Sequence, residues 1–590
     1  MTSIIANFST AQISKLSTTT IASLTTEDMQ ALTVNQVKAL SSTQISALDT
    51  DDVAVLSDDQ LKSISVKSIS GLTLDQLGVL DATKIVDFSS AQVAGFSTAQ
   101  LDGLDSDQVT ALTSDQVKGL TATQVSAFTS EDINLFTTDE IAAISTKAIS
   151  GLSTDVIANL STDSVAALGA KQIGSLSTTQ IASLTSAQTG ALSSDQVKGL
   201  TAKQVAAITT DAIAALGVED LSSAAVVGLT TTQLDTLTSD QVTALTSTQI
   251  KALSATQLGA FSSDDINSFE TDEIAAISSK SIAGLTTDAI ANLSATNIAA
   301  LTSAQVGALS STQIASLTST QVAGLSSDQV MGLSSKQVSA FTTDAIAVLS
   351  VENLSSAAVT GLTTTQIDTL GSDQVTALTS TQIKALSVAQ LGAFTSEDVN
   401  SFETDEIAAI STKAISGLST DVIANLSSAS VGALSSAQIT SLTSTQVGAL
   451  TSTQVGALTS DQVKGLTAKQ LPGLTTDALS ALTVENLTSA AAAGLTTGQI
   501  DALSDDQVTA LTATQIKGLS ATQIEAFSVD DIKKFSTDDI AAISVKSIAG
   551  LTTDDLAGLD HTQIEAFSSS QLQAMKDPQV EAVIAAYQVV

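Results

Sequence analysis

Residues 309–316 read Leu309-Ser-Ser-Thr-Gln-Ile-Ala-Ser316, and this eight-residue unit decides the fold because it is repeated along almost the whole chain. From Phe8 to Met575 a leucine, or a residue that can replace it, returns at every eighth position. The consensus is L-[ST]-x-x-[QDE]-[IV]-x-[AGS], lettered here a to h. A fixed short period outranks other sequence signals because it defines the architecture. A chain made of one short unit is expected to form a solenoid whose repeats contact mainly their neighbours.

Positions b and e of the octad predict a short helix. Ser or Thr at b, followed three residues later by Gln, Asp or Glu at e, is a capping box, which marks a helix N-terminus. The apolar residues at f and at the next a are three apart and share a helical face. One continuous helix would turn its apolar face by about 80° in each octad. We therefore predict an all-α solenoid of short capped helices, one per octapeptide repeat, held together by stacking.

A β-solenoid is the alternative fold. Ser, Thr, Val and Ile favour strands. In a straight strand, however, the odd spacing between a and f would place Leu and Ile on opposite faces, so each octad would need a corner. Pro472, at position g, is unfavourable inside a helix and predicts a local irregularity in the helical version.

A longer period of 133 residues lies above the octad. The phrase at Leu221–Val226 recurs at Leu354–Val359 and Leu487–Ala492, and each interval holds sixteen octads and one five-residue unit. These units are Leu216–Asp220, Leu349–Asn353 and Leu482–Asn486. The predicted organisation is a lead at 1–7, octads at 8–215, modules at 216–348 and 349–481, a partial module at 482–575, and a C-terminal cap or secretion signal at 576–590.

Composition argues against several classes of function. The chain carries 22 cationic side chains, all Lys, against 60 carboxylates, and its net charge is −38. Nucleic acid and anionic membranes are bound mainly through Lys and Arg, so we expect neither as a partner. No apolar run is long enough for a transmembrane helix. His561 is the only histidine and cysteine is absent, so we predict that the protein is not an enzyme.

The candidate site is an acidic phrase that recurs every 133 residues, starting at Phe128, Phe261, Phe394 and Phe527. Each copy places paired carboxylates in two successive octads. If neighbouring helices stack in register, the carboxylates converge and provide oxygen ligands for calcium. The alternative is that they complement the positive N-terminal ends of helices. The candidate calcium ligands are Glu131, Asp132, Asp139, Glu140, Asp264, Asp265, Asp272, Glu273, Glu397, Asp398, Asp405, Glu406, Asp530, Asp531, Asp538 and Asp539.

Two other features recur. A lysine follows each acidic phrase, and it forms either an ion pair within the chain or a contact between protomers. These lysines are Lys147, Lys280, Lys413 and Lys546. The Ser and Thr hydroxyls at b would form rows along the solenoid. Such rows either cap the helices or bind ice or sugar.

Tandem units such as Leu450-Thr-Ser-Thr-Gln-Val-Gly-Ala457, a pI near 4.1, and Lys without Arg resemble bacterial secreted low-complexity proteins of the surface-layer or extracellular-filament type. The resemblance implies a structural protein, outside the cell or on its surface, that self-assembles into a filament or surface layer. Cell-surface polysaccharide is a second implied partner. The tail Val580–Val590 is similar to an uncleaved type I secretion signal. The alternative function is a monomeric adhesive or ligand-binding stalk for ice or sugar.

Overall fold

The computed structural model describes residues 3–588, and the parts of the predicted lead and tail at residues 1–2 and 589–590 lie outside that range. Residues 3–588 form 64 α-helices and ten 3-10 helices and contain no β-strand. The all-α prediction is confirmed and the β-solenoid is excluded. In the same range no helix is both long enough and apolar enough to cross a bilayer.

Each regular octad forms one short helix. Helix α35 (Ser311–Ala315) begins after Ser310, whose backbone is extended at φ −70° and ψ 160°. The Ser310 hydroxyl accepts the Gln313 N–H at 3.2 Å, and the Gln313 Oε1 accepts the Ser310 N–H at 2.8 Å. This capping box is the predicted helix start. Apart from the last helix, the α-helices have four to six residues, too few to be stable without packing.

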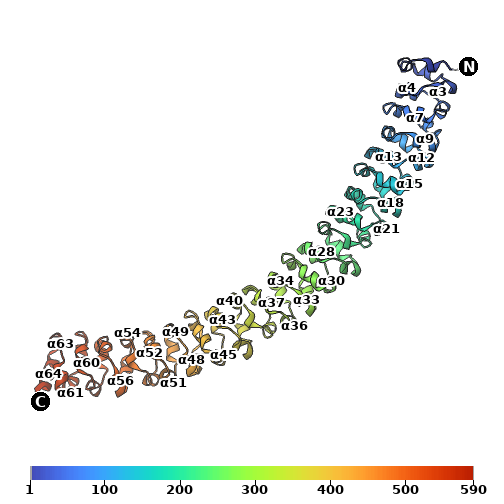
Figure 1. Ribbon diagram of the computed structural model, residues 1–590. Helices are drawn as coiled ribbons and strands as arrows, with labels where there is room; N and C mark the ends of the chain where they lie inside the picture. The colour runs from blue at the N-terminus through green and yellow to red at the C-terminus, as the bar shows by residue number, and fades with distance from the viewer. Residues whose placement is uncertain (1–2, 589–590) are drawn as a thin grey trace. The chain divides into compact units, whose positions relative to one another are not determined.

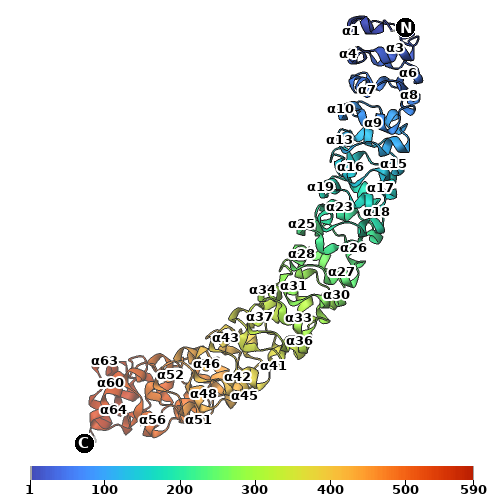
Figure 2. The same ribbon diagram turned by 45° about the vertical axis from the view of Figure 1, so that its right-hand side comes forward.

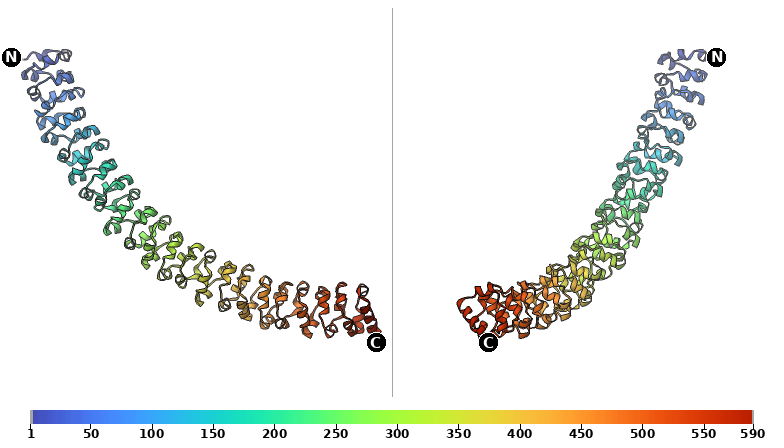
Figure 3. Two further views of the ribbon diagram at one scale, coloured as in Figure 1. Left: turned by 180° about the vertical axis from the view of Figure 1, so that it is seen from behind. Right: turned by 60° about the vertical axis from the view of Figure 1, so that its left-hand side comes forward.

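The chain divides into two compact units, residues 1–300 and 301–590, which are built in the same way. In the first unit, α4 (Val34–Lys38) packs on α7 (Asp58–Ser63) in the next coil. In the second unit, α34 (Ser303–Ala308) packs on α37 (Ser327–Met331). Figures 1 and 2 show this stacking of coils within each unit, and Figure 3 shows it from two other directions. Glutamine side chains donate to backbone carbonyls 25 to 31 residues earlier in the chain, so one coil takes about three and a half octads.

The apolar core runs through the coils at positions a and f. Leu309 is 4% exposed and Ile314 is fully buried. In each acidic phrase, phenylalanine occupies position a of two successive octads, and the two rings pack edge to face. Their centroids lie 5.2–5.6 Å apart in the pairs Phe128–Phe136, Phe261–Phe269, Phe394–Phe402 and Phe527–Phe535.

Glutamine at position e links consecutive coils. Gln188 is 2% exposed, and its Oε1 accepts the Thr185 N–H at 2.8 Å. Its Nε2 donates to the carbonyl oxygens of Ile157 at 2.7 Å and Leu160 at 2.8 Å, which are 31 and 28 residues earlier. One buried amide thereby satisfies three backbone groups. We call this repeated set of bonds between coils the glutamine ladder.

The five-residue units are shortened octads within the ladder. Gln241 donates to the carbonyls of Ile213 and Leu216, which lie only 28 and 25 residues earlier. The missing three residues are accounted for by the unit Leu216–Asp220, which forms the 3-10 helix η4 (Val218–Asp220). At Gln249 the offsets return to 31 and 28. The shift of register is therefore absorbed in one coil, and the stack continues.

Of the other 3-10 helices, η1 (Ile5–Asn7) precedes the first octad, and η6 (Val351–Asn353) and η9 (Val484–Asn486) lie in the other two five-residue units. The remaining six replace α-helices in specific octads. Pro472 lies in η8 (Leu471–Gly473), so the predicted irregularity is confirmed. A proline is tolerated there because its missing N–H falls at the start of a helical turn. A second group of tight octads follows a six-residue helix and ends in glycine. It consists of η2 (Ile69–Gly71), η3 (Ile149–Gly151), η5 (Ile282–Gly284), η7 (Ile415–Gly417) and η10 (Ile548–Gly550).

The terminal helix α64 (Asp577–Gln588) is longer than the rest, at 12 residues. Its Gln579 continues the ladder by donating to Ile548 O at 2.9 Å and Leu551 O at 2.7 Å. Farther along, the Tyr587 ring stacks on the His561 ring with centroids 4.7 Å apart. His561 is therefore partly covered, with its Nε2 3.4 Å from Glu565 Oε1. The helix packs against α61 (Thr553–Gly558) and α62 (His561–Glu565).

Candidate functional site

Half of the predicted calcium ligands occupy position e, where they act as capping-box acceptors. Asp132 accepts the Thr129 N–H at 2.8 Å and hydroxyl at 2.7 Å. Glu273 accepts the Glu270 N–H at 2.8 Å. A carboxylate in this position meets the positive end of its helix. The residues with this geometry are Asp132, Glu140, Asp265, Glu273, Asp398, Glu406, Asp531 and Asp539.

The other half of the predicted ligands occupy position d and are exposed. They are Glu131, Asp139, Asp264, Asp272, Glu397, Asp405, Asp530 and Asp538. In the fourth copy Asp530 forms an ion pair with Lys533 at 3.1 Å. Between residues 3 and 588, no three acidic or histidine side chains come close enough together to hold a metal ion. The structure thus separates capping acids from exposed acids in each phrase.

The acids at e also interrupt the glutamine ladder because a carboxylate cannot donate a hydrogen bond. A second interruption lies in the next coil, where Ser164 stands at position e, and there Asn134 supplies the link between coils. Its Oδ1 accepts the Ser161 N–H and the Ser164 hydroxyl, each at 2.8 Å. In the fourth phrase, Lys533 stands in place of this asparagine, and the partner octad carries Gln563, whose Nε2 donates to Lys533 O at 3.0 Å. Asn267 and Asn400 occupy the position of Asn134 in the second and third phrases.

Burial perturbs several acids at position e. Burial raises the pKa of Glu273 and of Glu406, and the neighbouring charges of Asp272 and Asp405 raise it further. Burial likewise raises the pKa of Asp52, and repulsion from Asp49 adds to the effect. Asp52 is 1% exposed, and its Oδ2 has no hydrogen-bond partner among the residues that the structure describes. Burial at these positions therefore favours the protonated carboxyl more than water does.

The lysines that follow the acidic phrases are exposed. Across residues 3–588, none of the four takes part in an ion pair. The ion pair within the chain is therefore not formed, and the contact between protomers stays a prediction.

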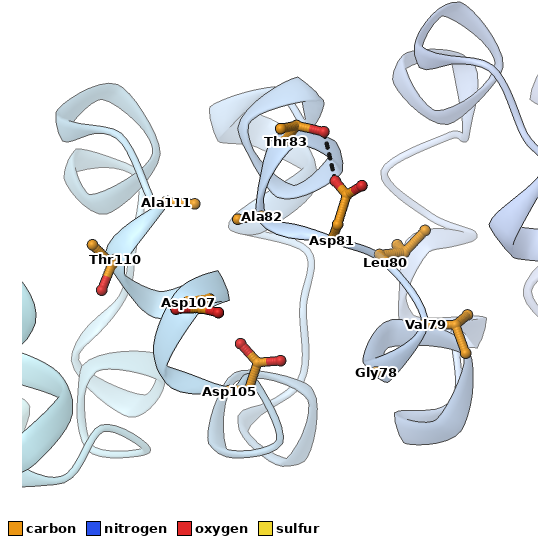
Figure 4. A pocket seen from close by; sticks show the side chains of 10 residues that line it. All are labelled: Gly78, Val79, Leu80, Asp81, Ala82, Thr83, Asp105, Asp107, Thr110 and Ala111. Carbon is orange, nitrogen blue, oxygen red and sulfur yellow. Dashed lines mark hydrogen bonds between the residues drawn. The ribbon is translucent and has the colours of Figure 1, made fainter.

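An acidic hollow of about 750 Å³ lies in the first unit beside Asp81, Asp105 and Asp107. Figure 4 shows these side chains around the hollow, with the Thr83 hydroxyl bonded to Asp81 at 2.5 Å. This hydroxyl, together with the Lys84 N–H, lowers the pKa of Asp81. Asp105 caps its helix by accepting the Gln108 N–H at 2.9 Å. Two of the three acids are therefore explained by capping.

A second kind of hollow recurs with the 133-residue period. In the second unit it lies between α43 (Ser380–Ala385) and α46 (Thr404–Ala409), and again between α57 (Ala513–Ile516) and α60 (Thr537–Ala542). In the first unit its counterpart lies beside α16 (Thr138–Ala143). We call these hollows the module grooves. Sequence reasoning missed them because their shape depends on which helices meet across coils.

The sequence pattern of the ALTTAQ repeat matches eight segments that together cover a little under half of the chain. They are 21–58, 85–114, 141–178, 165–202, 266–303, 298–335, 399–436 and 423–460. The six letters of the name correspond to position h of one octad followed by positions a to e of the next, as in Ala300-Leu-Thr-Ser-Ala-Gln305. These matches support a repeat protein. No curated protein matches the chain at a significant level.

Two of the known structures that align with the chain share little of its sequence. The leucine-rich repeat-containing protein LegL7 from Legionella pneumophila is 13% identical, covers 53% of this chain and 76% of its own, and gives a TM-score of 0.11. A homology model of the full-length AP-3 complex in an intermediate open conformation is 12% identical. It covers 99% of this chain and 93% of its own, and its TM-score is 0.14. Both TM-scores are too low for either likeness to carry an argument.

Proposed function

We propose that this chain is a structural protein whose copies assemble into a filament or surface layer outside the cell or on its surface. The observation that supports the proposal is the recurrence of the module groove along a stack of repeats. A surface that offers the same feature several times can engage a partner at several points together, and weak individual contacts then add up. Copies of the chain itself are the expected partners, with cell-surface polysaccharide as a second partner.

The proposed location follows from the compositional resemblance to secreted surface-layer and filament proteins. Export by type I secretion would use the C-terminal residues 576–590 as an uncleaved signal. Deleting this segment should leave the protein inside the producing cells, whereas deleting residues 1–7 should not. Fractionation of cells and medium measures both outcomes.

Electron microscopy of the purified full chain tests assembly. Ordered fibres or sheets that grow with protein concentration are the expected result. Isolated particles that persist at every concentration would instead favour the monomeric adhesive stalk. The Ser and Thr hydroxyls at b make the stalk less favourable as an ice or sugar binder, because they accept bonds from helix N–H groups, as Ser310 does.

A further inference from the structure

The module grooves of the second unit share both shape and charge. Their volumes are about 620 Å³ beside α46 and 580 Å³ beside α60. Lys384 and Asp405 line the first, and Lys517 and Asp538, each 133 residues later, line the second. The first-unit groove, of about 440 Å³, likewise carries Lys118. A lysine therefore lines the groove in the module 349–481, in the partial module 482–575 and in the octad region 8–215.

Small residues make the floor of each groove. Helix α46 ends in Ala408 and Ala409, and α60 ends in Ala541 and Ala542. A tight octad follows each of these helices. The methyl groups of these alanines leave space beside the aliphatic part of the lysine side chain. A long side chain in place of an alanine would fill the groove.

The charges in these grooves are not neutralised within the chain. All four side chains are exposed, and no ion pair within residues 3–588 includes Lys384, Lys517, Asp405 or Asp538. A protein of net charge −38 repels its own copies. Approach of two copies therefore needs a local site at which lysine meets a carboxylate of the other chain.

We propose that the two module grooves of the second unit form a two-fold contact between copies of this chain, in which Lys384 and Lys517 of one copy meet Asp405 and Asp538 of the other. A groove with one charge of each sign is self-complementary, as an isologous contact requires. Two grooves in one unit double the number of charge pairs. The inference rests on the proposed function, because it names the surface through which assembly begins.

Charge reversal tests this contact by sedimentation velocity at low and high salt. The variant K384E/K517E has only acidic grooves, and D405K/D538K has only basic ones. Each alone should dimerise about tenfold or more weakly than the unaltered chain. An equimolar mixture of the two should associate again, because acidic grooves then face basic ones. Loss of folding cannot produce recovery on mixing.

The matched control is K336E/K469E. These lysines are also exposed, also 133 residues apart and in the same unit, but they do not line the grooves. The control should associate like the unaltered chain at equal ionic strength. A408Q/A541Q, which fills the floors without a charge change, should weaken association.

The outcomes separate the two proposals. If the unaltered chain associates and the charge-reversed variants associate equally well, the groove contact is wrong and assembly stands. The groove contact is also wrong if the equimolar mixture of the two charge-reversed variants does not associate again. If the unaltered chain stays monomeric at every concentration and salt, assembly itself is wrong and the groove contact with it.

Discussion

A glutamine at position e has two functions that depend on different atoms. The Oε1 of Gln188 completes the capping box, and its Nε2 joins two carbonyls of the preceding coil. A buried donor or acceptor that loses its partner costs about 1–3 kcal/mol. Because the helices are too short to stand alone, these bonds and the apolar contacts beneath them hold the coils together.

Replacing Gln188 by Glu should destabilise the protein by about 1–3 kcal/mol at neutral pH, because the acceptor for the cap remains but the donor to Ile157 and Leu160 is lost. Chemical denaturation measures the change in the free energy of unfolding. The control is Gln12→Glu. Gln12 is exposed and forms a capping box with Ser9, but no ladder bond joins it to another coil in residues 3–588. Equal effects at the two positions would contradict a role for the ladder.

The sequence predicts the hydrogen bonds that the glutamine makes in the capping box. It does not predict the bonds that the same side chain donates to the preceding coil. A capping box is local, so Ser310 and Gln313 suffice to predict it. The ladder acceptors depend on the number of octads per coil, which the octad does not encode. The sequence does hold one signal for the ladder. Glutamine is preferred at position e although glutamate completes a capping box equally well, and this preference indicates that the side chain must also donate a hydrogen bond. The role of Asn134 gave no such signal, since its partners lie 27 and 30 residues away.

At the scale of the element, small residues at position h allow the coils to approach closely. A Cβ on Gly417 would collide with the backbone of Val388 in the preceding coil, whereas a Cβ on Gly432 would meet nothing. No glycine in residues 3–588 has a positive φ. Glycine is therefore needed at some positions for space and not for backbone conformation. The sequence predicts small spacers at h, which is the position of Gly417, whereas Gly432 lies at g. It does not predict that the backbone of Val388 lies against Gly417.

Gly417→Ala should therefore destabilise the second unit by about 1–3 kcal/mol, because the added methyl group forces the coils apart. Gly432→Ala should leave stability unchanged or raise it by up to about 1 kcal/mol, since alanine favours the helix and meets no obstacle. Thermal and denaturant unfolding of both variants measures the difference. Similar losses at both sites would show that coil contact at Gly417 is not the cause.

At the scale of the whole molecule, the dominant property is the excess of carboxylates. The sequence predicts that excess and the positions of the acidic phrases. It does not predict which acids are buried, because burial depends on the coil above. Glu273 and Asp272 are neighbours in sequence, yet Asp272 is exposed, whereas Glu273 is partly buried and burial raises its pKa.

Acidification from pH 7 to about 5 should raise the melting temperature. Glu273 and Glu406 have a raised pKa in the folded state, so the folded chain binds more protons than the unfolded chain. Their contribution to stability is present at low pH and is lost as pH rises through the folded-state pKa. The variant E273Q/E406Q should show a smaller pH dependence. The control E131Q/E397Q removes the same number of charges from exposed positions. It should retain more of the pH dependence of the melting temperature.

At still lower pH the trend should reverse. Hydrogen bonds from Thr83 and Thr562 lower the pKa of Asp81 and Asp560. Their contribution is present above the unfolded-state pKa and is lost as pH falls through the folded-state pKa. A melting temperature that rises without limit below about pH 3 would contradict this assignment.

Calcium at millimolar concentration should raise the melting temperature or promote assembly more than sodium at equal ionic strength, because paired carboxylates offer oxygen ligands and screening lets acidic copies approach. Replacing Asp264, Asp265, Asp272 and Glu273 by their amides should reduce the difference. The control replaces four exposed acids outside the phrases, Asp195, Asp240, Asp328 and Asp373. If a chelator changes neither melting nor assembly, the phrases serve only capping and solubility.

The glutamine ladder also gives each unit a direction. In every ladder bond described above, the donor amide belongs to the later coil and the accepting carbonyls to the earlier one. During synthesis the earlier coil leaves the ribosome first. Each newly emerging glutamine therefore meets acceptors that are already in place, and folding can follow translation one coil at a time. A nascent chain of this kind need not wait for any distant segment before it begins to fold.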